Sequence, residues 1–299
     1  LIHENLPELP VDNVIAEHAV RDTAGAIGLA ATVLTKYDPN AAMAVLTADQ
    51  IIEPPEVLQQ AIRDALACVN DNPDYMLTFG IQPTYPNTQL GYIKCASARK
   101  YPNSENTIYS VEAFKEKPDE ETAEEYLNTG QYFWNSGMFV WNAARILATL
   151  AKFLPEATDP LRKIQLGWDT PNQKQILQEW FLKLPKISID FAVMEKADNV
   201  YAIKLDCRWL DMGSFAALAD IISSDRDNNI VVASASELLN CKNSIIVTED
   251  HGHLIAAIGL ENIVVAHSLD ATLVCRIDQT ERLKELLELI KHHSGEKFL

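Results

Sequence analysis

The chain has 299 residues, of which 47% are hydrophobic and 22% are charged. This composition is that of a folded globular protein, and the length allows one large domain or one large and one small domain. The net charge of −17 excludes a broad surface for nucleic acid or for an anionic membrane, because either partner requires clustered lysine and arginine.

The five cysteines lie far apart and form no C-x-x-C pair, so we expect reduced thiols and a cytoplasmic protein. No run is long and apolar enough to span a membrane, and residues 1–15 do not have the pattern of a signal peptide. The chain opens on Leu1 instead of methionine, as though partway through a longer protein.

The first two thirds of the chain alternate between strand patterns and helix patterns. Strands are predicted at 11–16, 42–46, 75–81, 110–115 and 200–205. Helices are predicted at 24–34, from 54 to about 69, and at 119–128, 142–154, 172–184, 188–195 and 215–222, with a loop at 209–214. Because such alternation is typical of a layered α/β domain, we expect a largely parallel sheet.

The segment 17–23 joins the first predicted strand to a helix rich in alanine and glycine. Asp22 and Thr23 are both suitable N-cap residues for that helix. Ligands favour the carboxyl ends of strands in α/β sheets, and anions favour helix N-termini. We therefore expect this loop to lie at the ligand-binding edge of the sheet.

Asp49 and Asp211 each follow an apolar or aromatic segment at a predicted strand-to-loop junction. Because α/β folds gather such junctions at one edge of the sheet, the two carboxylates are candidates to hold Mg²⁺, which prefers hard oxygen ligands. The alternative is structural, with Asp49 as an N-cap and Asp211 as a turn former.

Residues 112–139 combine two polar features. Glu116 and Lys117 stand before a proline, and an acidic helix pattern follows. Asn135 and its neighbours Ser136 and Gly137 then interrupt an aromatic and apolar run. Polar groups in apolar sequence require partners once they are buried, so these residues are either paired internally or held ready for a ligand.

After residue 225 the pattern changes to short β-branched runs centred on Ile246, Ile255, Val264 and Leu273. Their even spacing predicts a small all-β unit, either a meander or a short β-solenoid, closed by an amphipathic helix at 279–291. We place the domains at 1–226 and 227–299.

Several kinds of site are not indicated. His251 and His253 are interpreted as part of an exposed turn, because no histidine or cysteine cluster has the spacing of zinc ligands. Glycine-rich phosphate loops and a G-x-S-x-G elbow are absent from the sequence. The residues alone indicate an α/β domain with a polar edge suited to a phosphorylated ligand.

Seven segments together resemble the motifs of the mannose-1-phosphate guanylyltransferases, a branch of the nucleoside-diphosphate-sugar pyrophosphorylases, over nearly the whole chain. They are Glu17 with R-D-T-A at 21–24, T-A-D-Q at 47–50, T-F-G-I-Q-P-T at 78–84, F-K-E-K-P at 114–118, W-N-S-G-M-F at 134–139, S-I-D-F-A-V-M-E at 188–195 and W-L-D-M-G at 209–213. The resemblance implies a Rossmann-like mixed, mostly parallel sheet with flanking helices, followed by a short β-helix-like unit and a closing helix.

The resemblance also implies a reaction, in which mannose 1-phosphate attacks GTP to give GDP-mannose and pyrophosphate. Asp49 and Asp211 become ligands of Mg²⁺, and Lys117 becomes the cation that faces the sugar phosphate. The implied substrate-binding residues are Glu17, Arg21, Asp22, Thr23, Gly91, Glu116, Asn135 and Asp190.

One departure from the family pattern is large. The glycine-rich signature G-G-x-G-T-R-L-x-P-L-S is absent from the sequence, together with the first strand and helix that accompany it. We therefore expect an N-terminally truncated form with little activity. Gln50 and Leu90 also differ from the residues usual in the family, so the resemblance does not fix which sugar and which nucleotide base are selected.

Two alternatives remain at this point. The first is a pyrophosphorylase for another sugar or base, and the second is a non-catalytic homologue that binds sugar nucleotides or has a regulatory role. The family resemblance favours a homodimer.

Overall fold

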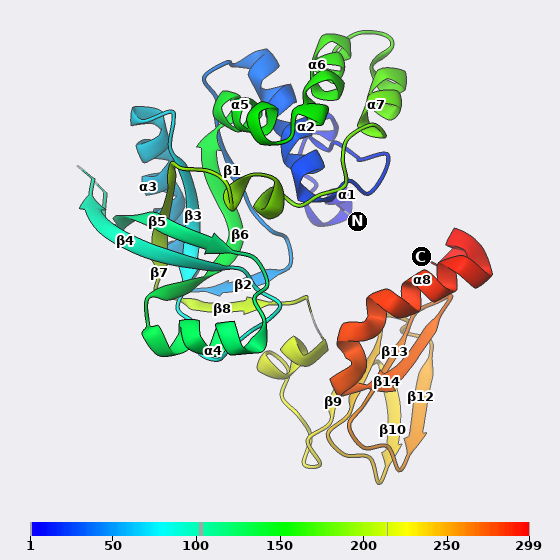
Figure 1. Cartoon of the computed structure of the whole chain (residues 1–299). Helices are drawn as coiled ribbons and strands as arrows, with labels where there is room; N and C mark the ends of the chain where they lie inside the picture. The colour runs from blue at the N-terminus through cyan, green and yellow to red at the C-terminus, as the bar shows by residue number, and fades with distance from the viewer. Residues whose placement is uncertain (1, 102–103, 214, 299) are drawn as a thin grey trace. The chain divides into compact units, whose positions relative to one another are not determined.

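The computed structural model describes residues 2–101, 104–213 and 215–298 (Figure 1). Two compact units are formed, one by Leu1–Thr47 with Glu53–Cys207 and the other by Ala48–Ile52 with Arg208–Leu299. The two units are distinguished by which residues contact one another. They do not test the predicted domain boundary at 226/227, which remains a prediction. Within the described residues, no helix is long and apolar enough to cross a bilayer.

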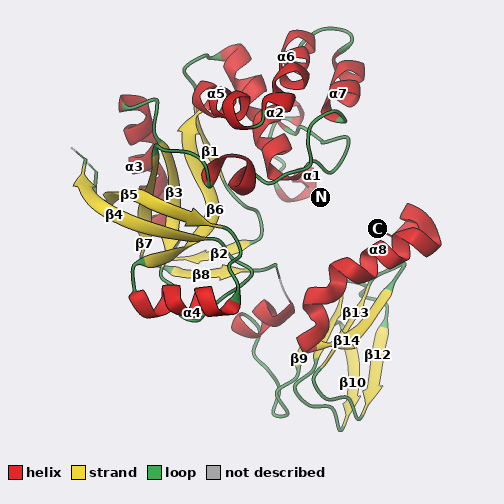
Figure 2. Cartoon of the chain, viewed as in Figure 1, coloured by secondary structure: helices red, strands yellow, loops and turns green. Residues whose placement is uncertain are grey.

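A six-stranded sheet forms the centre of the first unit, in the order β1–β6–β3–β7–β5–β4 (Figure 2). Its strands are β1 (Ala42–Val45), β3 (Met76–Ile81), β4 (Tyr92–Lys100), β5 (Thr107–Lys115), β6 (Tyr132–Asn142) and β7 (Val200–Leu205). Neighbouring strands pair antiparallel, apart from the parallel pair β3 and β7, and β4 also pairs with β6. Because β5 and β6 run against the other four strands, the sheet is mixed and mostly parallel in strand direction, as predicted.

The helices of the first unit follow local signals in the sequence. They are α1 (Ile2–Asn5), α2 (Asp22–Tyr37), α3 (Pro55–Asp71), α4 (Glu120–Thr129), α5 (Ala143–Phe153), α6 (Thr158–Gly167) and α7 (Gln173–Phe181). The Asp119 carboxylate accepts a hydrogen bond of 2.9 Å from Thr122 N and caps α4, which ends at Gly130 with a φ of 64°. Asn142 caps α5 by accepting from Ala144 N at 2.9 Å.

The apolar core of this unit lies between the sheet and helices α2, α5, α6 and α7. Trp141 and Phe139 of β6 are buried there with Ile146 of α5 and Phe181 of α7. The small residues of α2 allow close packing, since a Cβ at Gly28 would lie 3.1 Å from the Leu161 side chain of α6. The alanine and glycine content of this helix therefore reflects packing against neighbouring helices.

Several element predictions are wrong or incomplete. Residues 11–16 are not a strand, and Val11–Asn13 forms a 3-10 turn in which Asn13 N donates to Pro10 O. The predicted helix at 188–195 is shorter and is a π-helix, η3 (Asp190–Met194). The predicted loop at 209–214 contains most of β8 (Arg208–Asp211), which pairs with the unpredicted strand β2 (Gln50–Glu53).

The second unit contains a short parallel β-helix. Of the two predicted alternatives, the β-solenoid is therefore correct and the meander is wrong. Its strands are β9 (Ile230–Val232), β10 (Ala235–Leu239), β11 (Ile245–Thr248), β12 (Leu254–Ile258), β13 (Ile263–His267) and β14 (Thr272–Arg276). β9, β11 and β13 stack in parallel on one face and β10 and β12 on another, while β14 pairs antiparallel with β13. Helix α8 (Leu283–Ser294) follows a 3-10 turn at Ile277–Arg282.

Asparagines form the turn that precedes each strand of the first β-helix face. Asn228, Asn243 and Asn262 have φ values of 61°, 47° and 57°. Each lies two residues before one of the in-register core residues Ile230, Ile245 and Val264. Asparagine tolerates the left-handed conformation better than most residues, which explains its use at this repeated corner.

Candidate functional site

Gly91 and Glu116 are packed so closely that any side chain at position 91 would displace the Glu116 carboxylate. Gly91 immediately precedes β4, and its carbonyl oxygen accepts a hydrogen bond of 2.7 Å from Asn135 N. A Cβ at Gly91 would overlap Oε2 of Glu116 and would lie 3.4 Å from the Cβ of Asn135. The missing side chain therefore leaves the space in which the Glu116 carboxylate lies.

Asn135 of β6 has both ends of its amide engaged. Its Nδ2 donates to Asp190 Oδ1 at 3.1 Å, and its Oδ1 accepts from Thr78 Oγ1 at 2.8 Å. The β3–β6 register shifts between Thr78 and Gly80, beside the point where Asn135 pairs with Gly80. Such an irregularity redirects side chains. Asn135 is buried, with 6% of its surface exposed, so its orientation is fixed.

Asp190 lies at the first position of the π-helix η3, within hydrogen-bonding distance of Asn135. The pKa of Asp190 is raised to about 6, first by burial and second by the nearby Glu116 carboxylate. The Lys117 ammonium and the hydrogen bond from Asn135 lower the same pKa. Two carboxyl groups and one cation are thus electrostatically linked at one place.

Lys117 carries the positive charge of this group. Its φ of 44° is unusual for a residue other than glycine, and its Nζ forms an ion pair with Glu116 Oε1. The Lys117 side chain is 49% exposed, whereas that of Glu116 is 8% exposed. Glu116 N donates to Glu195 Oε1 at 3.1 Å, which ties the strand end to the segment after η3. A half-exposed lysine side chain is therefore paired with a buried carboxylate.

We call Gly91, Glu116, Lys117, Asn135 and Asp190 the Glu116 cluster. These five residues were all predicted site residues, and the structure brings them together in the first unit. Sequence reasoning gave no role to Thr78 or Glu195, which hold Asn135 and the backbone of Glu116 in place. The only feature of the sequence that could have identified Thr78 and Glu195 is that they lie within the motifs at 78–84 and 188–195.

The start of α2 lies beside the segment that leads into η3. Thr23 Oγ1 accepts a hydrogen bond of 2.8 Å from Ile189 N, and Ala24 N donates to Ile187 O at 3.2 Å. Asp22 has a φ of 62°, and its Oδ1 accepts from Thr23 N at 2.8 Å. These bonds place the N-terminus of α2 next to the residue that precedes Asp190.

Glu17 and Arg21 lie in the segment that precedes α2. The Arg21 guanidinium donates to Leu182 O, while its buried Nε has no hydrogen-bond partner among the described residues. Glu17 is exposed, and partial burial raises the pKa of its carboxyl group. Arg21 therefore carries one buried donor that the described residues leave unsatisfied.

Asp49 and Asp211 both belong to the second unit, where Asp49 immediately precedes β2 and Asp211 is the last residue of β8, its paired strand. Met212 N donates to Asp49 O at 2.9 Å, and Trp209 Nε1 donates to Gln50 Oε1 at 3.0 Å. Asp49 is exposed, and Asp211 Oδ1 accepts from Gly213 N at 3.3 Å. The prediction placed them at the edge of the main sheet, and the structure places them on a separate two-stranded sheet. Their hard carboxylate oxygens on neighbouring strands are of the type that suits Mg²⁺.

Comparison with known protein families assigns both parts of the chain. The Nucleotidyl transferase family model matches residues 4–228. This chain belongs to the nucleotidyl transferase family. The model of the MannoseP isomerase/GMP-like beta-helix domain matches residues 237–290, in agreement with the parallel β-helix of the second unit.

Similar proteins carry related names. A mannose-1-phosphate guanylyltransferase of Klebsiella pneumoniae is 36% identical over 301 aligned residues, which cover 100% of this chain and 62% of that protein. The xanthan biosynthesis protein XanB of Xanthomonas campestris pv. campestris is 36% identical over 292 residues, covering 96% of this chain and 60% of that protein. The chain thus spans about three fifths of the length of these curated relatives.

A crystal structure described as mannose-1-phosphate geranyltransferase from Thermus thermophilus has a similar fold. It superposes with a TM-score of 0.74 at 28% identity, covering 93% of this chain and 77% of that chain. The nucleotidyltransferase fold and the following β-helix are therefore shared features of this chain and its relatives.

Proposed function

We propose that this family member transfers a guanylyl group from GTP to mannose 1-phosphate, forming GDP-mannose and pyrophosphate. The observation that carries the proposal is the Glu116 cluster, in which one half-exposed ammonium and several oriented polar groups meet. The names of relatives 36% identical over nearly the whole chain support the same assignment.

In the proposed reaction, a phosphate oxygen of mannose 1-phosphate attacks the α-phosphorus of GTP. A new phosphorus–oxygen bond forms, and the bond between the α-phosphorus and the oxygen bridging to the β-phosphate breaks, so pyrophosphate leaves with that oxygen. Such a transfer requires little covalent chemistry from the protein, which contributes positioning and neutralisation of charge.

The Glu116 cluster is proposed to hold the sugar phosphate. Lys117 Nζ supplies the cation for the phosphate, and its charge-assisted contact exceeds a neutral hydrogen bond in strength. The Glu116 carboxylate and the Asn135 amide supply acceptors and donors for sugar hydroxyls. Asp190, with a pKa raised to about 6 by burial, fixes the amide of Asn135 and is a further hydroxyl partner.

Asp49 and Asp211 are proposed to hold Mg²⁺ through their carboxylate oxygens. The bound ion would neutralise charge on the triphosphate and on the leaving pyrophosphate. Asp211 already uses Oδ1 to accept from Gly213 N, which fixes the direction in which its carboxylate is presented.

The N-terminus of α2 is proposed to contact the nucleotide. Helix N-termini favour anions. Arg21, which immediately precedes α2, adds a guanidinium charge, and its buried Nε has no hydrogen-bond partner among the described residues. Glu17, Asp22 and Thr23 are the further candidates for contacts with base and ribose. Because the sequence has no glycine-rich phosphate loop, low turnover by these 299 residues remains a prediction.

A panel of substrates tests the proposal. The 299-residue chain is assayed for pyrophosphate release with GTP, ATP or UTP and with mannose 1-phosphate or glucose 1-phosphate, and binding of GDP-mannose, ADP-glucose and UDP-glucose is titrated in parallel. We expect GDP-mannose to bind best, and any turnover to require GTP with mannose 1-phosphate. Preference for another pair, or no binding of GDP-mannose, would contradict the proposal. The homodimer and the cytoplasmic location also remain predictions.

A further inference from the structure

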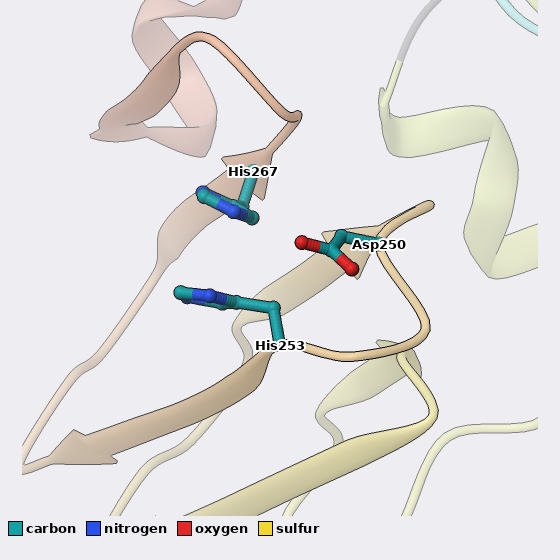
Figure 3. A group of neighbouring side chains, drawn as sticks. All are labelled: Asp250, His253 and His267. Atoms are coloured by element: carbon teal, nitrogen blue, oxygen red, sulfur yellow. The ribbon is translucent and has the colours of Figure 1, made fainter.

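Asp250, His253 and His267 converge at one edge of the β-helix, and the proposed function makes no use of them. Figure 3 shows their side chains pointing toward one another from the turn between β11 and β12 and from the end of β13. One ligand atom from each residue lies within 4.8 Å of the others. Sequence reasoning interpreted His253 as part of an exposed turn, because no histidine or cysteine cluster has the spacing of zinc ligands, and it gave no role to His267. His253 and His267 lie fourteen positions apart in the sequence, and the stacking of successive coils of the β-helix brings their side chains together.

The backbone of the β-helix fixes these positions. Thr248, the last residue of β11, is in register with His267 of β13. Asp250 N donates to Thr248 Oγ1 at 3.1 Å, and His253 N donates to Asp250 O at 3.2 Å. Asp250 Oδ1 also accepts from Gly252 N at 2.8 Å, which leaves Oδ2 for another partner. A tight turn therefore presents Asp250 and His253 beside the next coil.

His267 has a partner that orients its ring. Its Nδ1 lies 2.8 Å from Thr272 Oγ1, and Thr272 is the residue opposite His267 in β14. Metal-binding histidines commonly use one ring nitrogen for such a contact, which fixes the tautomer and leaves the other nitrogen as the ligand. The ring of His253 stacks on that of His267 with centroids 3.9 Å apart and an interplanar angle of 19°.

Two imidazoles and one carboxylate form a donor set suited to zinc and related transition metals. Zn–N bonds of about 2.0–2.1 Å require donors of a tetrahedral site to be roughly 3.3 Å apart. The ligand atoms lie within 4.8 Å of one another, so binding an ion would require the side chains to move closer, and His253 is exposed and has room to rotate. Two neutral imidazoles and one carboxylate leave one of the two positive charges of a divalent ion uncompensated by the three ligands, in a protein whose net charge is −17.

We propose that Asp250, His253 and His267 form a binding site for a divalent transition metal such as Zn²⁺. The ion would join the turn after β11 to the end of β13, so it would clip together two successive coils of the β-helix. Three protein ligands leave at least one coordination position for water or for a group from another molecule. This site is separate in its residues and in its metal preference from the carboxylates proposed for Mg²⁺.

The test is a zinc titration of the whole chain, prepared without a histidine tag and stripped with a chelator. Binding is followed by competition with a chromogenic zinc indicator, and unfolding temperature is recorded with and without Zn²⁺. We expect one ion per chain and a rise in unfolding temperature that EDTA reverses. The variants His253→Gln, His267→Gln and Asp250→Asn should each lose more affinity than the about tenfold to hundredfold that removal of an outer partner costs.

Matched controls separate the cluster from its surroundings. His251 lies in the same turn but pairs with Ser234 Oγ at 2.7 Å, so His251→Gln should bind Zn²⁺ as the unaltered chain does. The adjacent pair His292 and His293 of α8 provides a second control, as a double Gln variant. The double variant Asp49→Asn with Asp211→Asn should also retain zinc binding.

Thr272→Val removes the partner of His267 without removing a ligand, and it should weaken zinc binding by about tenfold to hundredfold. This variant and Asp250→Asn provide the test if a histidine variant does not fold. Absence of a defined zinc stoichiometry in the unaltered chain would overturn the proposal. Equal binding by the cluster variants and the His251→Gln control would overturn it as well.

Discussion

Asn135 and Asp190 are joined by a hydrogen bond of 3.1 Å in which the amide donates to the carboxylate. This bond lies where burial has raised the pKa of Asp190 to about 6 from an ordinary 3.8. Between these two pH values the folded chain binds more protons at Asp190 than the unfolded chain does. The contribution of Asp190 to stability therefore falls as the pH rises from about 4 to about 6.

Asp190→Asn removes the buried charge and keeps an oxygen that can accept from Asn135. We expect this variant to gain stability relative to the unaltered chain as the pH rises through this window, reaching about 1–3 kcal/mol above pH 6. Thermal unfolding at a series of pH values measures this difference. Asp206→Asn, at an exposed carboxylate after β7, is the control. A difference that does not change with pH would contradict the account.

Gly91→Ala tests whether the Glu116 carboxylate requires the space above the glycine. The new methyl group would overlap Glu116 Oε2, so we expect a loss of about 1–3 kcal/mol in unfolding free energy and weaker sugar phosphate binding. Urea unfolding measures the first effect and calorimetric titration the second.

The double variant Gly91→Ala with Glu116→Ala removes the overlapping carboxylate. If that overlap is the cause, the glycine substitution should cost less stability in this background, which a double-mutant cycle reports directly. Equal costs in both backgrounds would assign the effect to the backbone or to Asn135 instead.

The asparagine turns of the β-helix predict an order of stability among substitutions. Asn243 has a φ of 47°, and its Oδ1 accepts from Asn228 Nδ2 at 2.9 Å. Asn243→Ala should lose about 1–2 kcal/mol, because alanine is strained in the left-handed conformation. Asn243→Gly loses the same hydrogen bond without that strain and should be the more stable variant in urea unfolding. The reverse order would show that the side-chain contact outweighs the backbone conformation.

Asp211→Asn separates a metal ligand from a turn former. The amide oxygen of asparagine still accepts from Gly213 N, so we expect an unfolding temperature close to that of the unaltered chain. The rise in unfolding temperature that Mg²⁺ produces in the presence of GTP should be lost. Asp211→Ala should show the same loss with little change in stability. A large fall in stability for either variant would favour the turn-forming role.

Much of the fold follows from local patterns in the sequence. The predicted helices from 54 to about 69 and at 119–128 correspond to α3 and α4, and the predicted strand at 42–46 corresponds to β1. Local signals suffice in these segments because each element buries one regular face or ends at a residue with a distinct backbone preference.

Long-range pairing explains the features that were missed. β2 and β8 are short strands separated by more than 150 residues, and neither has an apolar run that identifies it. Thr78 supports Asn135 across 57 residues through a register shift that no local pattern reveals. The approach of His253 to His267 likewise depends on the stacking of coils. In contrast, residues 11–16 have a strand-like pattern but form a local turn at Val11–Asn13.

Binding of mannose 1-phosphate tests the central claim most directly, because it depends on the Glu116 cluster and not on turnover. We expect the 299-residue chain to bind mannose 1-phosphate more tightly than glucose 1-phosphate in calorimetric titrations. Lys117→Ala should weaken that binding about tenfold to hundredfold, as loss of a charge-assisted hydrogen bond does. Lys115→Ala, an equal change of charge at an exposed residue two positions earlier, should leave it nearly unchanged. Equal affinities of the Lys117 and Lys115 variants, or no binding by the unaltered chain, would contradict the proposed function.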